Sequence, residues 1–135
     1  MGFTENLKLR AYLSEWLDPI EWDFYLTGTF GDKGTCHPTK DIFTAKRRFD
    51  RFLDEFPKAD FKYFYACEPH RTKFLHIHSL LKLETLVMPS DEDIWKVWFE
   101  KLGRCTVSVY EKDRGVRYYL TKYVTKDLFD YQVKF

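Results

Sequence analysis

The stretch that most constrains this chain is residues 74–81, Phe-Leu-His-Ile-His-Ser-Leu-Leu, which holds two of the four histidines in an otherwise mainly apolar run. Such a run predicts a β-strand, whose side chains alternate between the two faces of a sheet. His76 and His78 therefore share one face, while Leu75 and Ile77 share the other. One face is suited to a hydrophobic core and the other to binding a ligand.

A carboxylate is expected beside the two histidines. Residues 61–68 predict a second strand, and the turn-like residues 69–73 separate it from the first. If the strands pair as an antiparallel hairpin centred near Thr72, Glu68 stands opposite His76, and directly opposed residues share a face. Glu68, His76 and His78 would then surround one point. Two imidazoles and a carboxylate suit Mg²⁺, Mn²⁺ or Zn²⁺, with positions left open for water or substrate.

The rest of the chain predicts alternating helices and strands without a repeat or a linker, so residues 1–135 are expected to form one domain. A glycine inside a strand, Gly28, indicates a bulge or a close backbone approach. Hydrophobic periodicity and end signals predict helices over 4–17, 38–56, 91–102 and 115–129, and further strands over 22–30 and 104–110.

Composition narrows the class of protein. Three cysteines without a C-x-x-C spacing favour reduced thiols over a disulfide framework. Neither a signal peptide nor a membrane-spanning run is present, which favours a soluble intracellular protein. The net charge is only +1, but residues 101–135 contain eight basic and four acidic residues, and aromatic residues make up 19% of the chain. Basic residues interleaved with aromatic ones are typical of surfaces that bind unpaired bases.

The last predicted helix carries two tyrosines and two lysines on one face, because Tyr119, Lys122, Tyr123 and Lys126 follow an i, i+3, i+4, i+7 spacing. A tyrosine attacks poorly near neutral pH unless a cation stabilises its phenolate, and a lysine can do so. A phosphodiester is the electrophile that suits a tyrosine, a divalent ion and a basic surface. The product would be a covalent phosphotyrosine.

Three motifs, in order, resemble those of HUH endonucleases, especially the replication initiator (Rep) proteins of rolling-circle plasmids and single-stranded DNA viruses. Residues 25–30, Tyr-Leu-Thr-Gly-Thr-Phe, are similar to the first strand motif of that family. His76-Ile-His78 is similar to its histidine-hydrophobic-histidine motif, with Glu68 where many members supply a third metal ligand. Residues 119–126, Tyr-Leu-Thr-Lys-Tyr-Val-Thr-Lys, resemble the catalytic tyrosine helix.

This resemblance implies an α+β fold with a central antiparallel sheet of about five strands, packed helices and the catalytic tyrosine on the last helix. It implies an enzyme that uses Mn²⁺ or Mg²⁺ to nick single-stranded DNA at a replication origin. The nick would leave a 3′ hydroxyl and a 5′-phosphotyrosine, and strand transfer would follow. The implied partners are single-stranded DNA or an origin hairpin and a host replication helicase or polymerase, in the cytoplasm or in the nucleus of a eukaryotic host, without a membrane.

The tyrosine motif of residues 119–126 has two interpretations. As Tyr-x-x-Lys it implies one nucleophile, Tyr119, assisted by Lys122, which is the interpretation we favour. As Tyr-x-x-x-Tyr-x-x-Lys it resembles two-tyrosine initiators, with Tyr123 as a second nucleophile and Lys126 beside it. Two other functions stay open: a single-tyrosine HUH transposase or relaxase-like strand transferase, and a non-catalytic domain that binds single-stranded nucleic acid.

Overall fold

The computed structural model describes residues 3–31, 36–56, 60–69, 72–85, 87–123, 128 and 130–134. All strand pairs of its five-stranded sheet are antiparallel, and the strand order is β4-β1-β3-β2-β5. The predicted α+β fold is therefore confirmed. The elements are α1 (Phe3–Leu17), β1 (Phe24–Thr29), α2 (Ile42–Asp54), β2 (Asp60–Pro69), β3 (Leu75–Glu84), α3 (Asp91–Lys101), β4 (Cys105–Val109), the short 3₁₀ helix η1 (Lys112–Arg114), α4 (Gly115–Tyr123) and β5 (Asp130–Lys134).

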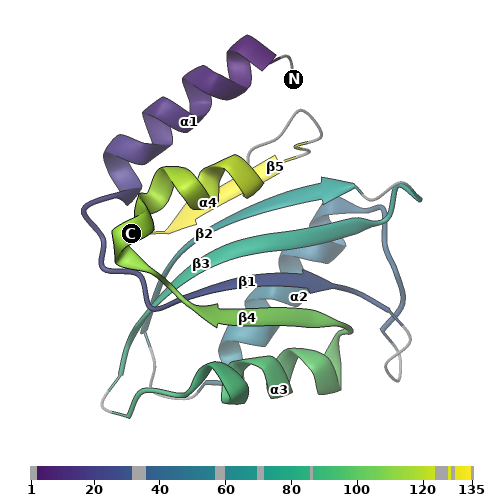
Figure 1. Cartoon of the computed structure of the whole chain (residues 1–135). Coiled ribbons are helices and arrows are strands. Elements are labelled where there is room, and N and C mark those ends of the chain that lie inside the picture. Colours follow the sequence, from purple (N-terminus) through teal and green to yellow (C-terminus); the bar gives the residue numbers. More distant parts are fainter. Residues whose placement is uncertain are drawn as a thin grey trace.

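Helices cover both faces of the sheet, with α1 and α4 on one side and α2 and α3 on the other (Figure 1). Successive side chains of each strand point to opposite faces of the sheet, so each strand contributes apolar residues to a core on each face. Leu26 and Ile77 belong to the core beneath α2 and α3, together with Trp98. Phe64 and Leu80 belong to the core beneath α1 and α4. His76 and His78 lie on the α1 and α4 face because they alternate with Ile77.

Gly28 lies where the backbone of β1 closely approaches α3. A Cβ atom built on Gly28 would lie 2.3 Å from Cζ2 of Trp98, too close for any real contact. The Trp98 indole also donates a hydrogen bond to the Thr29 carbonyl oxygen at 2.9 Å, which fixes the ring against β1. The close backbone approach predicted from the sequence is confirmed, and glycine is the residue that permits it.

The helix starts follow capping chemistry. The Asp41 carboxylate accepts a hydrogen bond from the Thr44 amide at 3.2 Å, so α2 begins at Ile42, four residues later than predicted. Ser90 and Asp93 form a reciprocal capping box at the start of α3. Both helices then turn an apolar stripe toward the sheet. Among the described residues, no helix combines the length and apolar character needed to cross a bilayer.

The predicted helix over 115–129 was wrong at Leu128, which lies outside any helix. Asp130–Lys134 forms β5, which pairs antiparallel with the outer side of β2, and Cys67 lies opposite Asp130. The pairing gives β2 a neighbour on both sides, and Tyr131 and Val133 pack on the core beneath α1 and α4. The described part of α4 ends at Tyr123, so the predicted positions 124–127 lie outside the described residues.

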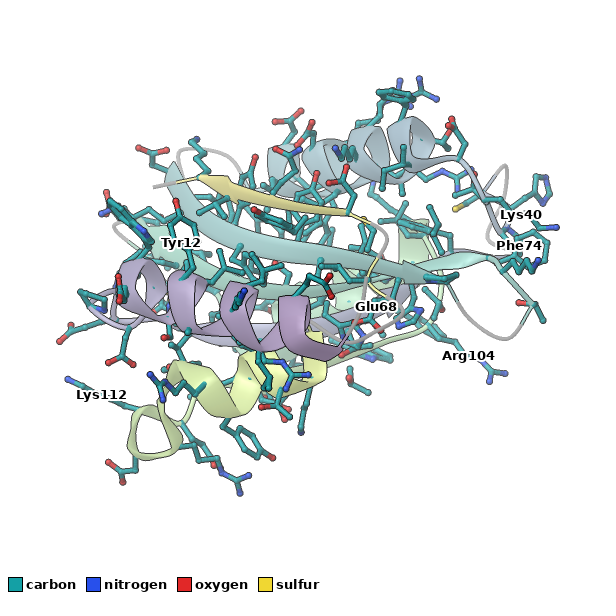
Figure 2. All side chains as sticks on the ribbon, turned by 90° about the horizontal axis from the view of Figure 1, so that it is seen from above. Tyr12, Lys40, Glu68, Phe74, Arg104 and Lys112 are labelled. Carbon is teal, nitrogen blue, oxygen red and sulfur yellow. The ribbon has the colours of Figure 1, made fainter. Side chains whose placement is uncertain are left out.

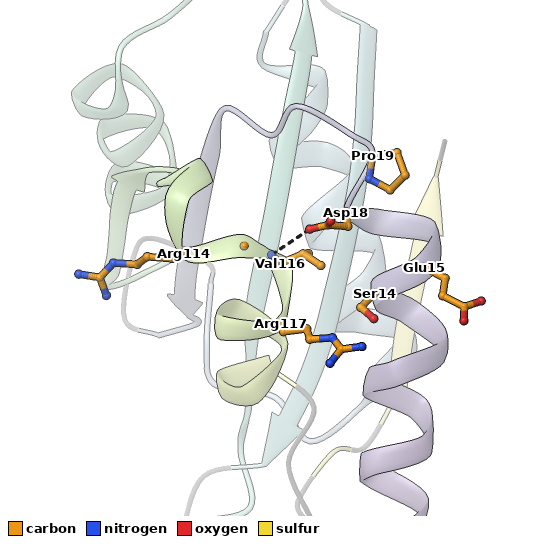
Figure 3. A pocket seen from close by; sticks show the side chains of 8 residues that line it. Ser14, Glu15, Asp18, Pro19, Arg114, Val116 and Arg117 are labelled. Atoms are coloured by element: carbon orange, nitrogen blue, oxygen red, sulfur yellow. Dashed lines mark hydrogen bonds between the residues drawn. The ribbon is translucent and has the colours of Figure 1, made fainter.

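The start of α4 is attached to the end of α1 (Figure 3). The Asp18 carboxylate accepts a hydrogen bond from the Val116 amide at 3.4 Å, and a hollow of about 470 Å³ lies between the two helices here. A carboxylate at this place complements the positive end of the α4 dipole. Leu17 of α1 and Leu120 of α4 share the core below. These contacts hold α4 across the face of the sheet that carries the two histidines.

Candidate metal centre and tyrosine helix

The paired strands β2 and β3 bring the three predicted metal ligands together. Glu68 lies opposite His76, as predicted, and the ligand atoms of Glu68, His76 and His78 all lie within 4.8 Å of one another. The Nε2 atoms of the two histidines are 2.9 Å apart. Two ligand atoms of one ion, each about 2.0–2.2 Å from the ion and separated by an angle between 90° and the tetrahedral value, lie about 2.8–3.6 Å apart. The donor set and its spacing therefore fit a divalent ion.

A threonine of β1 orients one of these ligands. Thr27 lies in register with His78, and its hydroxyl is 3.1 Å from Nδ1 of that histidine. This contact directs the Nε2 atom of His78 toward His76, in the way that outer hydrogen bonds position metal-binding imidazoles. Glu68 is only 6% exposed, and Figure 2 shows it in the same half of the molecule as Arg104 and Phe74. The candidate centre thus lies near the end of β2 and the start of β3.

Tyr119 is enclosed by other residues. It is 1% exposed, and its hydroxyl accepts a hydrogen bond from the Glu111 amide at 2.8 Å. The Tyr110 ring stacks on it with a centroid distance of 4.6 Å, and Tyr25 lies at 5.0 Å. Burial raises the pKa of the Tyr119 hydroxyl. In this arrangement Tyr119 is protonated at neutral pH and shielded from solvent.

The Tyr119 hydroxyl is also directed away from the three ligands. Its partner Glu111 follows β4, and Val109 at the end of β4 lies opposite Phe24 at the start of β1. The ligands lie beside Thr27 and Thr29, three to five residues further along β1. At about 3.3 Å per residue, the two regions are roughly 10–17 Å apart along the strand. The structure does not bring this hydroxyl to the candidate metal centre.

Lys122 contacts a different tyrosine from the one expected. Its Nζ atom lies 4.6 Å from the ring centroid of Tyr118, and the Arg114 guanidinium lies 4.6 Å from the same ring. A hydrogen bond with Lys122 and the charge of Arg114 lower the pKa of the Tyr118 hydroxyl, which is the more exposed of the two neighbouring tyrosines. The i, i+4 spacing in the sequence places Tyr118 near Lys122, as observed, but it assigned Tyr118 no role.

The other two predicted residues come later in the chain. Tyr123 is the last residue of α4, and Lys126 lies outside the described residues. Figure 2 shows α4 running along the sheet in the direction of Glu68. The four residues from Tyr119 to Tyr123 advance the helix by about 6 Å, so the backbone of Tyr123 is nearer to the candidate metal centre than that of Tyr119. The catalytic roles of both tyrosines and both lysines stay predictions.

These features define an α+β protein with a candidate divalent metal centre on one sheet face and a tyrosine-bearing helix across that face. The model of the replication-associated protein ORF2/G2P family matches residues 23–128, and the chain belongs to this family. The matched range runs from the start of β1 past the end of α4 and includes all three motifs. No match was found among curated proteins or solved structures. Family membership supports a role in starting replication.

Proposed function

We propose that this protein is a metal-dependent, sequence-specific endonuclease and strand transferase for single-stranded DNA. It would nick a replication origin through a 5′-phosphotyrosine and so start rolling-circle replication. The observation that carries the proposal is the cluster of Glu68, His76 and His78 on the sheet face that α4 crosses, in a member of a replication-associated protein family.

The candidate metal ligands act together in the proposed reaction. Glu68, His76 and His78 hold a divalent ion, and Thr27 keeps His78 oriented. Mg²⁺ and Mn²⁺ are the ions that best suit phosphate chemistry with a mixed nitrogen and oxygen donor set. When bound, the ion polarises a non-bridging oxygen of the scissile phosphate and neutralises the charge that develops there.

A tyrosine of α4 performs the attack. Its oxygen loses a proton and forms a bond to phosphorus, while the bond between phosphorus and the 3′ oxygen breaks. The 3′ oxygen takes up a proton and leaves as a hydroxyl, so the 5′ phosphate stays on the tyrosine. The reverse attack by a 3′ hydroxyl rejoins the strand, which accounts for strand transfer without another energy source. Lys122 and Lys126 would stabilise the phenolate form.

We assign the first attack to Tyr123 and a later one to Tyr119, although the sequence motif alone favours Tyr119. The burial of Tyr119, its raised pKa and its bond to Glu111 all oppose a first attack by this residue. Tyr119 would become available once the hydrogen bond to Glu111 is broken and its ring leaves the Tyr110 stack. Two nucleophiles one helical turn apart suit successive transfers at one metal centre.

The test is formation of a covalent adduct with a labelled pool of randomised single-stranded DNA in Mn²⁺, resolved on a denaturing gel. The native protein should form an adduct, and His76→Ala should not. His37→Ala is the matched control, because His37 is exposed and lies outside the metal cluster. An undiminished adduct in His76→Ala would rule out the metal centre. Binding of DNA without any adduct would favour a non-catalytic binding domain.

A further inference from the structure

A second feature adjoins the candidate metal centre on the side of β4. A hollow of about 410 Å³ contains two aromatic rings of α3, Trp95 and Phe99. The rings are stacked, with centroids 4.7 Å apart and planes inclined by 12°, and Trp95 is 38% exposed. The hollow is lined by Thr27, Thr29, Trp95, Phe99, Arg104, Cys105 and Thr106.

The exposed tryptophan is held in place by the neighbouring strand. The Trp95 indole donates a hydrogen bond to the Cys105 carbonyl oxygen at 3.1 Å, and the Cys105 thiol donates one to the Trp95 carbonyl oxygen at 3.5 Å. A ring fixed in this way loses little conformational entropy when a ligand stacks on it. The aromatic pair is therefore a preorganised surface.

The hollow shares residues with the metal centre. Thr27 lies in register between His78 on β3 and Thr106 on β4, and it both contacts His78 and lines the hollow. Thr29 lies opposite His76 and donates a hydrogen bond to the Arg104 carbonyl oxygen at 3.1 Å. The two strand spacings from β3 across β1 to β4 correspond to about 10 Å. A stacked single strand covers that distance with roughly three nucleotides.

We propose that Trp95 and Phe99 form a stacking platform for an unpaired base close to the scissile phosphate, with Arg104 contacting a neighbouring phosphate. This inference rests on the proposed function, because it requires single-stranded DNA to leave the face that carries the two histidines and pass over the edge strand β4 to α3, which covers the opposite face. Arg104 is the only charged residue of the seven that line the hollow, so the site combines an apolar ring pair with one cation. Aromatic stacking accepts any base. A duplex covers its base faces with neighbouring pairs, so the platform selects single strands.

The first test measures binding of a fluorescent oligothymidylate by anisotropy in the presence of a chelator, which separates binding from cleavage. Trp95→Ala should bind about tenfold more weakly, the loss expected for one stacked base. Trp95→Phe, which keeps an aromatic ring, should retain most of the affinity. Trp16→Ala is the matched control, because Trp16 is an exposed tryptophan of α1 and lies outside the hollow. Equal affinities for Trp95→Ala and Trp16→Ala would contradict the proposed stacking platform.

The second test examines the phosphate contact and the base directly. Arg104→Ala should reduce the salt dependence of binding by about one counterion, whereas Arg51→Ala on α2 should not. Photo-crosslinking with 5-iododeoxyuridine should label the tryptic peptide that contains Trp95. Crosslinks confined to other peptides would contradict the inference.

The two proposals can fail separately. If the native protein forms no adduct but Trp95→Ala still weakens binding of single strands, the cleavage chemistry is wrong and the platform stands. If the native protein forms the adduct and Trp95→Ala matches it in both adduct yield and affinity, the platform is wrong and the chemistry stands.

Discussion

The hydroxyl of Tyr119 accepts a hydrogen bond from the backbone amide of Glu111 at 2.8 Å. This bond connects the middle of α4 to the segment between β4 and η1. The same tyrosine stacks on Tyr110 and contacts Tyr25, so one side chain joins the helix to β1 and to the residue that follows β4. The residue that the sequence motif offers as a nucleophile is, in this arrangement, part of the core that positions the helix.

Removing only the hydroxyl should therefore destabilise the protein. We expect Tyr119→Phe to lower the free energy of unfolding by about 1 kcal/mol, because the Glu111 amide loses its partner while the ring stays. Urea denaturation measures the change. Tyr12→Phe is the control, since Tyr12 is an exposed tyrosine of α1. If both variants unfold at the same urea concentration as the native protein, the hydrogen bond contributes no stability.

Stability should fall as the pH rises above about 10. Burial raises the pKa of the Tyr110 hydroxyl to about 12 and also raises that of Tyr119. The unfolded chain releases these protons near pH 10, whereas the folded protein keeps them until the pH reaches the raised pKa values. The unfolded chain is therefore increasingly favoured as the pH rises from 10 through those values. Below pH 10 this contribution to stability is fully present. Tyr110→Phe should show a shallower decline of the urea midpoint above pH 10, and an unchanged slope would contradict the assignment.

Gly28 should not tolerate even the smallest side chain. Gly28→Ala places a Cβ atom against the Trp98 ring, which is buried and hydrogen-bonded to Thr29, so the strand or the ring must shift. Overpacking of this kind costs about 1–3 kcal/mol, measurable by thermal or urea unfolding. At Gly31 the nearest atom to such a Cβ is a Pro38 carbon at 3.4 Å, an ordinary contact. Equal effects of Gly28→Ala and Gly31→Ala would contradict the packing argument.

The register of the metal ligands could be predicted from the sequence for a local reason. Alternation assigns His76 and His78 to one face, and the short turn after Pro69 fixes which residue of β2 lies opposite each of them. Both facts depend on residues close together in the chain. The carboxylate of Glu68 and the two imidazoles therefore converge as predicted.

Other features could not be predicted because they depend on distant partners. Helical spacing identified the face that carries Tyr119, but Tyr25 and Tyr110 bury that residue, and they come from β1 and the end of β4. The strand β5 was missed because apolar spacing continues beyond α4, and its pairing with β2 is a tertiary contact. The alternation of Tyr131 and Val133 was the available local signal.

Binding of a divalent ion should stabilise the folded protein. A ligand at a hundred times its dissociation constant adds about 2.7 kcal/mol to the free energy of unfolding, so Mn²⁺ should raise the melting temperature by several degrees. His78→Ala should lose this shift, and a chelator should reverse it in the native protein. His37→Ala should keep it. An equal Mn²⁺ shift in His78→Ala would mean that the ion binds elsewhere.

The most direct test of the account is to locate the DNA-linked residue by mass spectrometry after trypsin digestion of the covalent adduct. Cleavage after Lys122 separates residues 118–122, which contain Tyr118 and Tyr119, from residues 123–126, which contain Tyr123. In a single round of cleavage, we expect the nucleotide on the peptide 123–126, with loss of the adduct in Tyr123→Phe and its retention in Tyr119→Phe. Absence of any adduct, or a nucleotide linked to a residue outside α4, would contradict the proposed function. A first linkage at Tyr119 would contradict the order of attack.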